Sequence, residues 1–145
     1  MTTFQTAPLS MQTFLHGDHL DVAVRELMTA DVISVGEDAT LRQVSRTLHR
    51  HQVHAALVLR RSDGRPLGWV TMHGLAVNTD ADSVTMTAKE VITEKPIWIS
   101  PSAKARDALA LMRKEGVSHL FVSERPLQPP RGVISETDIA RLAAL

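Results

Sequence analysis

The residues with the clearest chemical potential stand near the C-terminal end of the chain, where an apolar run meets a polar stretch. Ser135 closes the run and Asp138 follows three residues later. A serine between a strand and a helix lies beside the free N–H groups of the first helical turn, which can face a phosphate. An aspartate three residues on can accept hydrogen bonds from ribose hydroxyls. The pair therefore suggests a site for a sugar phosphate.

The same spacing also has a purely structural interpretation. Ser-x-x-Asp before an apolar run is an ordinary capping box, in which each side chain bonds the backbone of the other residue. The two interpretations are compatible, because a residue that caps a helix can also contact a ligand.

An internal repeat determines which elements position these residues. Leu27 aligns with Val91, and the same shift of 64 residues brings identical residues together without a gap. Identities at one register over about fifty residues are not explained by composition, so the chain is a tandem duplication. The identical pairs include Glu26 and Glu90, Thr29 and Thr93, Ile33 and Ile97, Ala39 and Ala103, Arg42 and Arg106, Val53 and Val117, Val58 and Val122, Pro66 and Pro130, Gly68 and Gly132, and Ala76 and Ala140.

Each copy is predicted to contain a β-α-β-β-α unit after a short lead-in helix. Short β-branched runs indicate strands, and apolar residues at helical spacing indicate helices. The first copy has a lead-in helix at Val24–Met28, strands at Val32–Val35, Ala55–Leu59 and Trp69–Thr71, a helix carrying Leu41, Val44 and Leu48, and a last helix at Met72–Val77. The second has the matching elements at Ala88–Ile92, Pro96–Ile99, Leu120–Ser123, Val133–Ser135 and Glu136–Ala144, with a helix carrying Ala105, Ala108, Leu109 and Met112.

These units are too small to bury an adequate core alone. We expect an α+β fold in which the two repeats pack sheet to sheet with pseudo-two-fold symmetry. The predicted organisation is an N-terminal arm at 1–23, a first repeat at 24–77, a polar linker at 78–86 and a second repeat at 87–145.

Two segments of the second copy resemble the cystathionine β-synthase (CBS) domain. Residues 116–122 read Gly-Val-Ser-His-Leu-Phe-Val, and residues 132–139 read Gly-Val-Ile-Ser-Glu-Thr-Asp-Ile. The chain is similar to a complete CBS pair, or Bateman module, over both copies. The resemblance implies a regulatory module that binds AMP, ADP, ATP or an adenosyl ligand such as S-adenosylmethionine in the cleft between its repeats. It also implies a homodimer that signals through a separate effector protein.

The resemblance places the nucleotide in a first cleft, around Ser135 and Asp138. His119 stands where the family often has a basic residue, and a protonated imidazole can contact a phosphate. The opposite repeat is expected to contribute its lead-in strand and an apolar wall. The ligand-binding residues implied are Thr29, Val32, Ser34, Val53, His119, Val133, Ser135 and Asp138.

The equivalent positions of the other copy define a second cleft, in which two of these groups are missing. Gly74 replaces the aspartate and Ala55 the histidine, so the ribose acceptor and the cation are absent. Thr71 keeps the hydroxyl, and Thr93 is the counterpart of the lead-in threonine. The indole of Trp98 either fills this cleft or packs against the linker. We therefore predict one usable site and one degenerate site, and a dimerisation or interaction scaffold without ligand is the alternative function.

No catalytic set emerges elsewhere. The chain has neither a glycine-rich phosphate loop nor an H-E-x-x-H helix. His49, His51 and His54 have no cysteine or nearby carboxylate to complete a zinc site, so we expect solvated histidines at a helix end. These observations predict a protein that is not an enzyme and that holds no cofactor or metal.

Composition narrows the classes of partner. Among 145 residues, Lys and Arg number 16 and Asp and Glu also number 16, which gives no overall attraction to nucleic acid or to an anionic membrane. The arginines around Asp63 and Gly64 lack interleaved aromatic residues for base stacking. The chain has no cysteine, no apolar run of membrane-spanning length and no visible secretory signal. The expected location is the cytoplasm.

Overall fold

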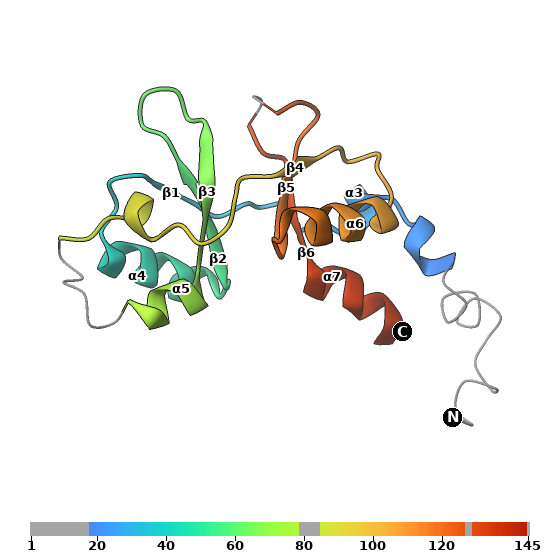
Figure 1. The fold of residues 1–145 in the computed structure, drawn as a ribbon, viewed down its shortest axis with the longest axis horizontal. Helices are drawn as coiled ribbons and strands as arrows, with labels where there is room; N and C mark the ends of the chain where they lie inside the picture. Colours follow the sequence, from blue (N-terminus) through green and yellow to red (C-terminus); the bar gives the residue numbers. More distant parts are fainter. Residues whose placement is uncertain (1–17, 79–84, 127–128, 145) are drawn as a thin grey trace.

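The computed structural model describes residues 18–78, 85–126 and 129–144, which form two lobes side by side (Figure 1). Each lobe contains one three-stranded sheet, with strand order β1-β2-β3 in lobe 1 and β4-β5-β6 in lobe 2. In each sheet the first pair of strands is parallel and the second pair is antiparallel. The α+β fold expected for paired repeats is confirmed.

Lobe 1 follows the predicted order of elements. Its strands are β1 (Ser34–Gly36), β2 (Ala55–Leu59) and β3 (Pro66–Thr71), and its helices are α4 (Leu41–His51) and α5 (Met72–Val77). A capping box between Thr40 and Gln43 begins α4, and Gln52 ends it in the left-handed conformation, with φ of 54°. The turn between β2 and β3 contains Gly64, whose φ of 73° favours glycine.

Lobe 2 repeats this arrangement. Its strands are β4 (Trp98–Ile99), β5 (His119–Val122) and β6 (Gly132–Ser135). Its helices are α6 (Ala105–Glu115) and α7 (Glu136–Ala140), and α7 continues as the 3-10 helix η3 (Arg141–Ala144). The predicted strand at Pro96–Ile99 is thus shorter, and the predicted last helix changes type after Ala140.

The lead-in segment of each repeat packs against the other lobe. Helix α3 (Val24–Leu27), which follows the 3-10 helix η1 (Asp18–Asp21), places Val24 in the core of lobe 2. The 3-10 helix η2 (Ala88–Val91) lies in the core of lobe 1. The chain therefore crosses twice between the lobes, and both crossings are visible in Figure 1.

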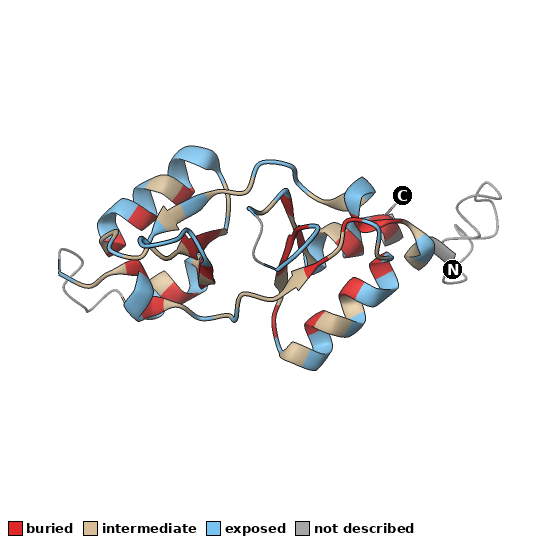
Figure 2. Ribbon diagram, turned by 90° about the horizontal axis from the view of Figure 1, so that it is seen from above, coloured by how far each residue is buried: buried red, intermediate tan, exposed pale blue. Residues whose placement is uncertain are grey.

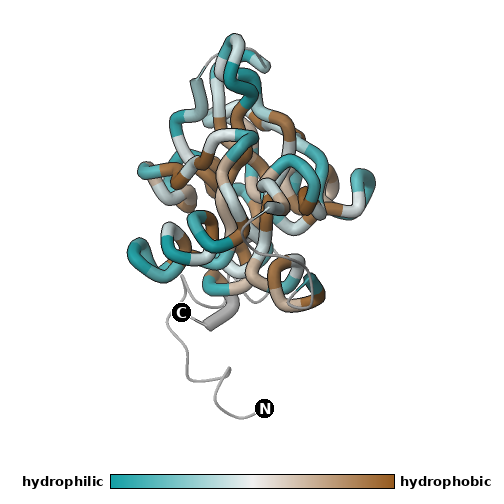
Figure 3. Tube along the Cα trace, turned by 90° about the vertical axis from the view of Figure 1, so that its left-hand side faces the viewer, coloured by the Kyte–Doolittle hydropathy of each residue, from teal (hydrophilic) through white to brown (hydrophobic). Residues whose placement is uncertain are grey.

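A third hydrophobic cluster joins the two sheets. Leu57, Trp69 and Phe121 are its buried members, and each is at most 2% exposed. Buried residues follow the inner faces of sheets and helices (Figure 2). Hydrophobic segments lie mainly in the middle of the fold and hydrophilic ones mainly towards the outside (Figure 3). The two repeats thus share a core, as the size of each repeat requires.

Candidate functional site

The capping box predicted at Ser135 is present at the junction of β6 and α7. The Oγ of Ser135 accepts a hydrogen bond from the backbone N of Asp138 at 3.3 Å. In return, the backbone N of Ser135 donates to Oδ2 of Asp138 at 2.8 Å, and its hydroxyl donates to the same oxygen at 3.1 Å. This exchange holds the aspartate side chain at the end of the strand.

The second carboxylate oxygen of Asp138 is less engaged. Oδ1 accepts only a long hydrogen bond of 3.4 Å, from the exposed guanidinium of Arg141. The Asp138 side chain is 11% exposed, so it does not point into bulk water. One oxygen is therefore fixed by the cap, and the other is open to a second acceptor role.

Thr29 belongs to the first repeat but lies beside β6 of lobe 2. Its backbone N donates to the O of Val133 at 2.9 Å, and the N of Val133 donates to its O at 3.0 Å. Gly132 permits this approach, because a β-carbon there would lie 2.7 Å from the O of Thr29. Thr29 and Val133 thus form a seam between the repeats, and Ser135 follows Val133 by two residues on the same strand.

The remaining residues predicted from the first repeat make contacts of a different kind. Val32 packs against the cluster that joins the two sheets. Ser34, in β1, pairs with Leu57 of β2. It also lines a pocket of about 430 Å³ beside the β2–β3 turn. Val53 packs against the core of lobe 1.

The structure places His119 at the second cleft. His119 pairs with Ser135 in the sheet, but it lines a pocket of about 460 Å³ together with Thr71 and Thr93. Its ring also lies 5.5 Å from the indole of Trp69, at a tilt of 35°. His119 thus pairs with Ser135 in the sheet of lobe 2, and it also lines the second cleft.

In the second cleft, the Thr93 side chain fills the space beside Gly74, where the first cleft has the carboxylate of Asp138. Thr71 caps α5 by accepting from the backbone N of Gly74 at 3.0 Å. A β-carbon at Gly74 would lie 2.5 Å from Cγ2 of Thr93, and the two threonine hydroxyls are 3.3 Å apart. Trp98 is partly buried against the inter-sheet cluster, while Ile97 and Ile99 pack in the core of lobe 2.

Sequence reasoning missed Glu94, which lines the second cleft. Its carboxylate accepts from the backbone N of Ser118 at 2.9 Å, from the Ser118 hydroxyl at 2.6 Å and from the backbone N of His119 at 3.2 Å. Burial would raise the pKa of Glu94, but hydrogen bonds from His119 and Ser118 outweigh burial and lower the pKa to about 2. The available signal was a difference between the copies, since Ala30 stands at the equivalent position.

Residues 18–78, 85–126 and 129–144 contain no group of three or more His, Cys, Asp or Glu side chains arranged to hold a metal ion. Among the helices described, none is both long enough and apolar enough to cross a membrane.

Comparison with known proteins places these features in a family. Hypoxic response protein 1 of Mycobacterium tuberculosis is 30% identical over 123 residues, which cover 81% of this chain and 82% of that protein. The crystal structure of Hypoxic Response Protein I with two coordinated zinc ions is similar, with a TM-score of 0.68 and 25% identity over 83% of this chain and 98% of that one. The CBS domain protein PAE2072 from Pyrobaculum aerophilum, complexed with AMP, has a TM-score of 0.70 and 24% identity over 86% of this chain and all of that one (100%). The family model for the CBS domain matches residues 24–77 and 88–145, and the chain therefore belongs to the CBS domain family.

Proposed function

We propose that this protein is a regulatory module that binds one adenine nucleotide in the first cleft. The observation that carries the proposal is the seam at which Thr29 of one repeat hydrogen-bonds Val133 of the other, two residues before Ser135 and its capping partner Asp138. A ligand held by both sides of this seam has different affinity for different arrangements of the repeats, which is what a sensor requires.

Each polar group at the seam has a role in this proposal. Oδ1 of Asp138 accepts hydrogen bonds from the ribose hydroxyls, as acidic residues do in other nucleotide sites. The hydroxyl of Thr29, an exposed residue, donates to the phosphate, and the Ser135 hydroxyl joins it by turning away from Oδ2 of Asp138. Val32 and Val133 supply apolar surface for the base. His119 contributes through its strand, because it pairs with Ser135.

The bound AMP of PAE2072 supports the choice of an adenine nucleotide, because that protein has the same fold. The second cleft is not expected to bind a nucleotide in the same way, because it lacks the ribose acceptor and Thr93 fills the space at Gly74. The proposal therefore gives one nucleotide for each chain. It also makes the protein a binding module, not an enzyme, in the cytoplasm, where adenine nucleotides are available.

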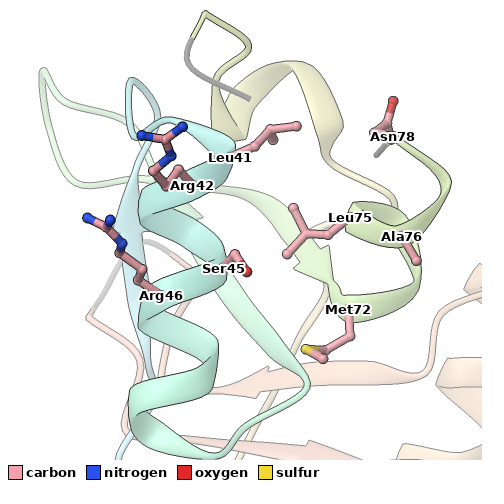
Figure 4. Close-up of a pocket in the computed structure, with 8 residues that line it drawn as sticks. All are labelled: Leu41, Arg42, Ser45, Arg46, Met72, Leu75, Ala76 and Asn78. Carbon is pink, nitrogen blue, oxygen red and sulfur yellow. The ribbon is translucent and has the colours of Figure 1, made fainter. Parts of the chain in front are cut away.

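We also propose that the protein is a homodimer and that it acts on a separate effector protein. A groove between α4 and α5 has a mixed lining, with apolar side chains of Leu41, Met72, Leu75 and Ala76 and polar ones of Arg42, Ser45, Arg46 and Asn78 (Figure 4). Met72 in this groove is 48% exposed and the neighbouring Val77 is 65% exposed, although both are large hydrophobic residues. Exposed apolar surface of this kind marks interaction sites in soluble proteins.

The alternative is a dimerisation or interaction scaffold in which the box at Ser135 serves only as a cap. The two functions are separated by thermal unfolding of the wild type with AMP, ATP and S-adenosylmethionine. At about 100 times its Kd, a ligand adds about 2.7 kcal/mol to stability, which raises Tm by several degrees. Asp138→Ala is expected to abolish this rise.

A matched control distinguishes lost binding from lost capping. Asp107 accepts a hydrogen bond from the backbone N of Lys104 at 3.0 Å at the start of α6, so it has the same capping role without a place in the cleft. Asp107→Ala should cost about 1 kcal/mol, as cap loss does, but should keep the nucleotide-dependent rise in Tm. A rise that survives Asp138→Ala would favour the scaffold.

A further inference from the structure

The second cleft contains one carboxylate in a pocket that otherwise resembles a phosphate site. Imidazoles of His54, His73 and His119 line it, together with hydroxyl-bearing residues of both lobes. Imidazoles and hydroxyls are common donors to phosphate. Glu94 is the acidic residue among those that line this pocket, and its side chain is 15% exposed.

Hydrogen bonds from two directions hold Glu94 in place. Its backbone O accepts from the N of Trp69 on β3 at 2.9 Å, which attaches the residue to lobe 1. Its carboxylate accepts from Ser118 and His119 at the start of β5, in lobe 2. The backbone of Glu94 is therefore anchored to lobe 1, and its carboxylate cannot leave the cleft without breaking its hydrogen bonds to lobe 2.

This carboxylate stays ionised at neutral pH, because its hydrogen bonds lower its pKa to about 2. Two unit negative charges about 5 Å apart at a protein surface repel by about 3 kcal/mol at an effective dielectric constant of 20. A phosphate that entered the pocket would meet part of this repulsion, because Glu94 is only 15% exposed and solvent screens it incompletely. The His119 ring, 3.6 Å away, offsets the charge only when it is protonated.

The first cleft has no carboxylate at the equivalent position, because its carboxylate is that of Asp138 at the start of α7. Ala30 is the counterpart of Glu94 in the internal repeat, and it follows Thr29 as Glu94 follows Thr93. The two clefts thus differ in the position of their carboxylate as well as in the ribose acceptor.

We propose that Glu94 is a specificity-determining residue that excludes phosphate groups from the second cleft. This inference deepens the proposed function. What it implies for the number of nucleotides bound by each chain rests on that function. The exclusion itself concerns only phosphate and the second cleft, so it can be tested without a nucleotide.

The test is a titration of the full chain with inorganic pyrophosphate at pH 6.5, followed by NMR of the imidazoles of His73 and His119. Pyrophosphate has no ribose, so the missing acceptor at Gly74 does not affect the result. Glu94→Gln removes the charge but keeps an oxygen that accepts from the backbone of Ser118 and His119. We expect pyrophosphate to bind this variant at least about tenfold more tightly than the wild type, from the loss of one nearby negative charge.

Glu90→Gln is the control, since it removes the same charge from an exposed position four residues earlier. It should leave the wild-type titration unchanged. Equal affinity of the wild type and Glu94→Gln, or no imidazole shifts in Glu94→Gln, would overturn the proposal. AMP-dependent shifts of the Ser135 and Asp138 amides report separately on the proposed function.

Should Glu94→Gln fail to fold, Ala30→Glu tests the same effect in the first cleft. There, a new carboxylate should weaken pyrophosphate binding, measured from the shift of the Ser135 amide, by a smaller factor, because position 30 is exposed and solvent screens the charge. An unchanged shift would count against charge exclusion.

Discussion

Gly74 and Thr93 are packed so closely that a β-carbon on the glycine would lie 2.5 Å from the methyl group of the threonine. The two residues belong to different repeats. They meet because the lead-in segment that carries Thr93 packs against lobe 1. Position 74, the equivalent of Asp138, therefore lacks a carboxylate, and the Thr93 side chain fills the space in which one would lie.

This packing predicts that a side chain at position 74 is costly. Gly74→Ala should destabilise the protein by about 1–3 kcal/mol, as overpacking does, measured by urea unfolding. Thr93→Ser removes the methyl group that a new β-carbon would meet. In the Thr93→Ser background, Gly74→Ala should cost less, and an equal cost in both backgrounds would contradict the packing argument.

The low pKa of the Glu94 carboxylate predicts that the protein loses stability in acid. Its pKa of about 2 lies below the ordinary value of 4.5, so its ionised form stabilises the folded state above pH 4.5. That stabilisation, on the order of 2 kcal/mol, should disappear as the pH falls from about 4.5 to about 2. The measurement is the free energy of unfolding against pH for the wild type and for Glu94→Gln. The variant should show a shallower slope over this range, and parallel curves would contradict the assignment.

The inter-sheet cluster predicts that both lobes depend on one shared core. Phe121→Ala should destabilise the protein by about 3–5 kcal/mol, because the ring is 2% exposed. Trp98→Ala should cost less, because this indole is only partly buried at the edge of the same cluster. The comparison is made by denaturant unfolding with a single probe in each lobe, and separate transitions for the two lobes would argue against a common core.

Local patterns in the sequence predicted most of the fold because the repeat supplied each element twice. The strand at Ala55–Leu59 and the helix at Met72–Val77 have the predicted bounds. The strand predicted at Pro96–Ile99 is shorter, since proline has no N–H to donate to a sheet. The capping box at Ser135 could also be predicted, because its two residues are only three positions apart in the sequence.

The contacts that distinguish the clefts could not be predicted in the same way. Glu94 meets Ser118 and His119 only because the lead-in segment crosses between the lobes, and no local spacing encodes that crossing. The position of Trp98 depends on the same long-range packing. Both are tertiary relationships between residues more than twenty positions apart.

The number of AMP molecules bound by each chain tests the central claim most directly. Isothermal titration calorimetry of the full chain should give one AMP per chain for the wild type and for Asp107→Ala, and no detectable binding for Asp138→Ala. Two molecules per chain, or binding that persists when Asp138 is replaced, would contradict the account of a single nucleotide site at the Thr29–Ser135 seam.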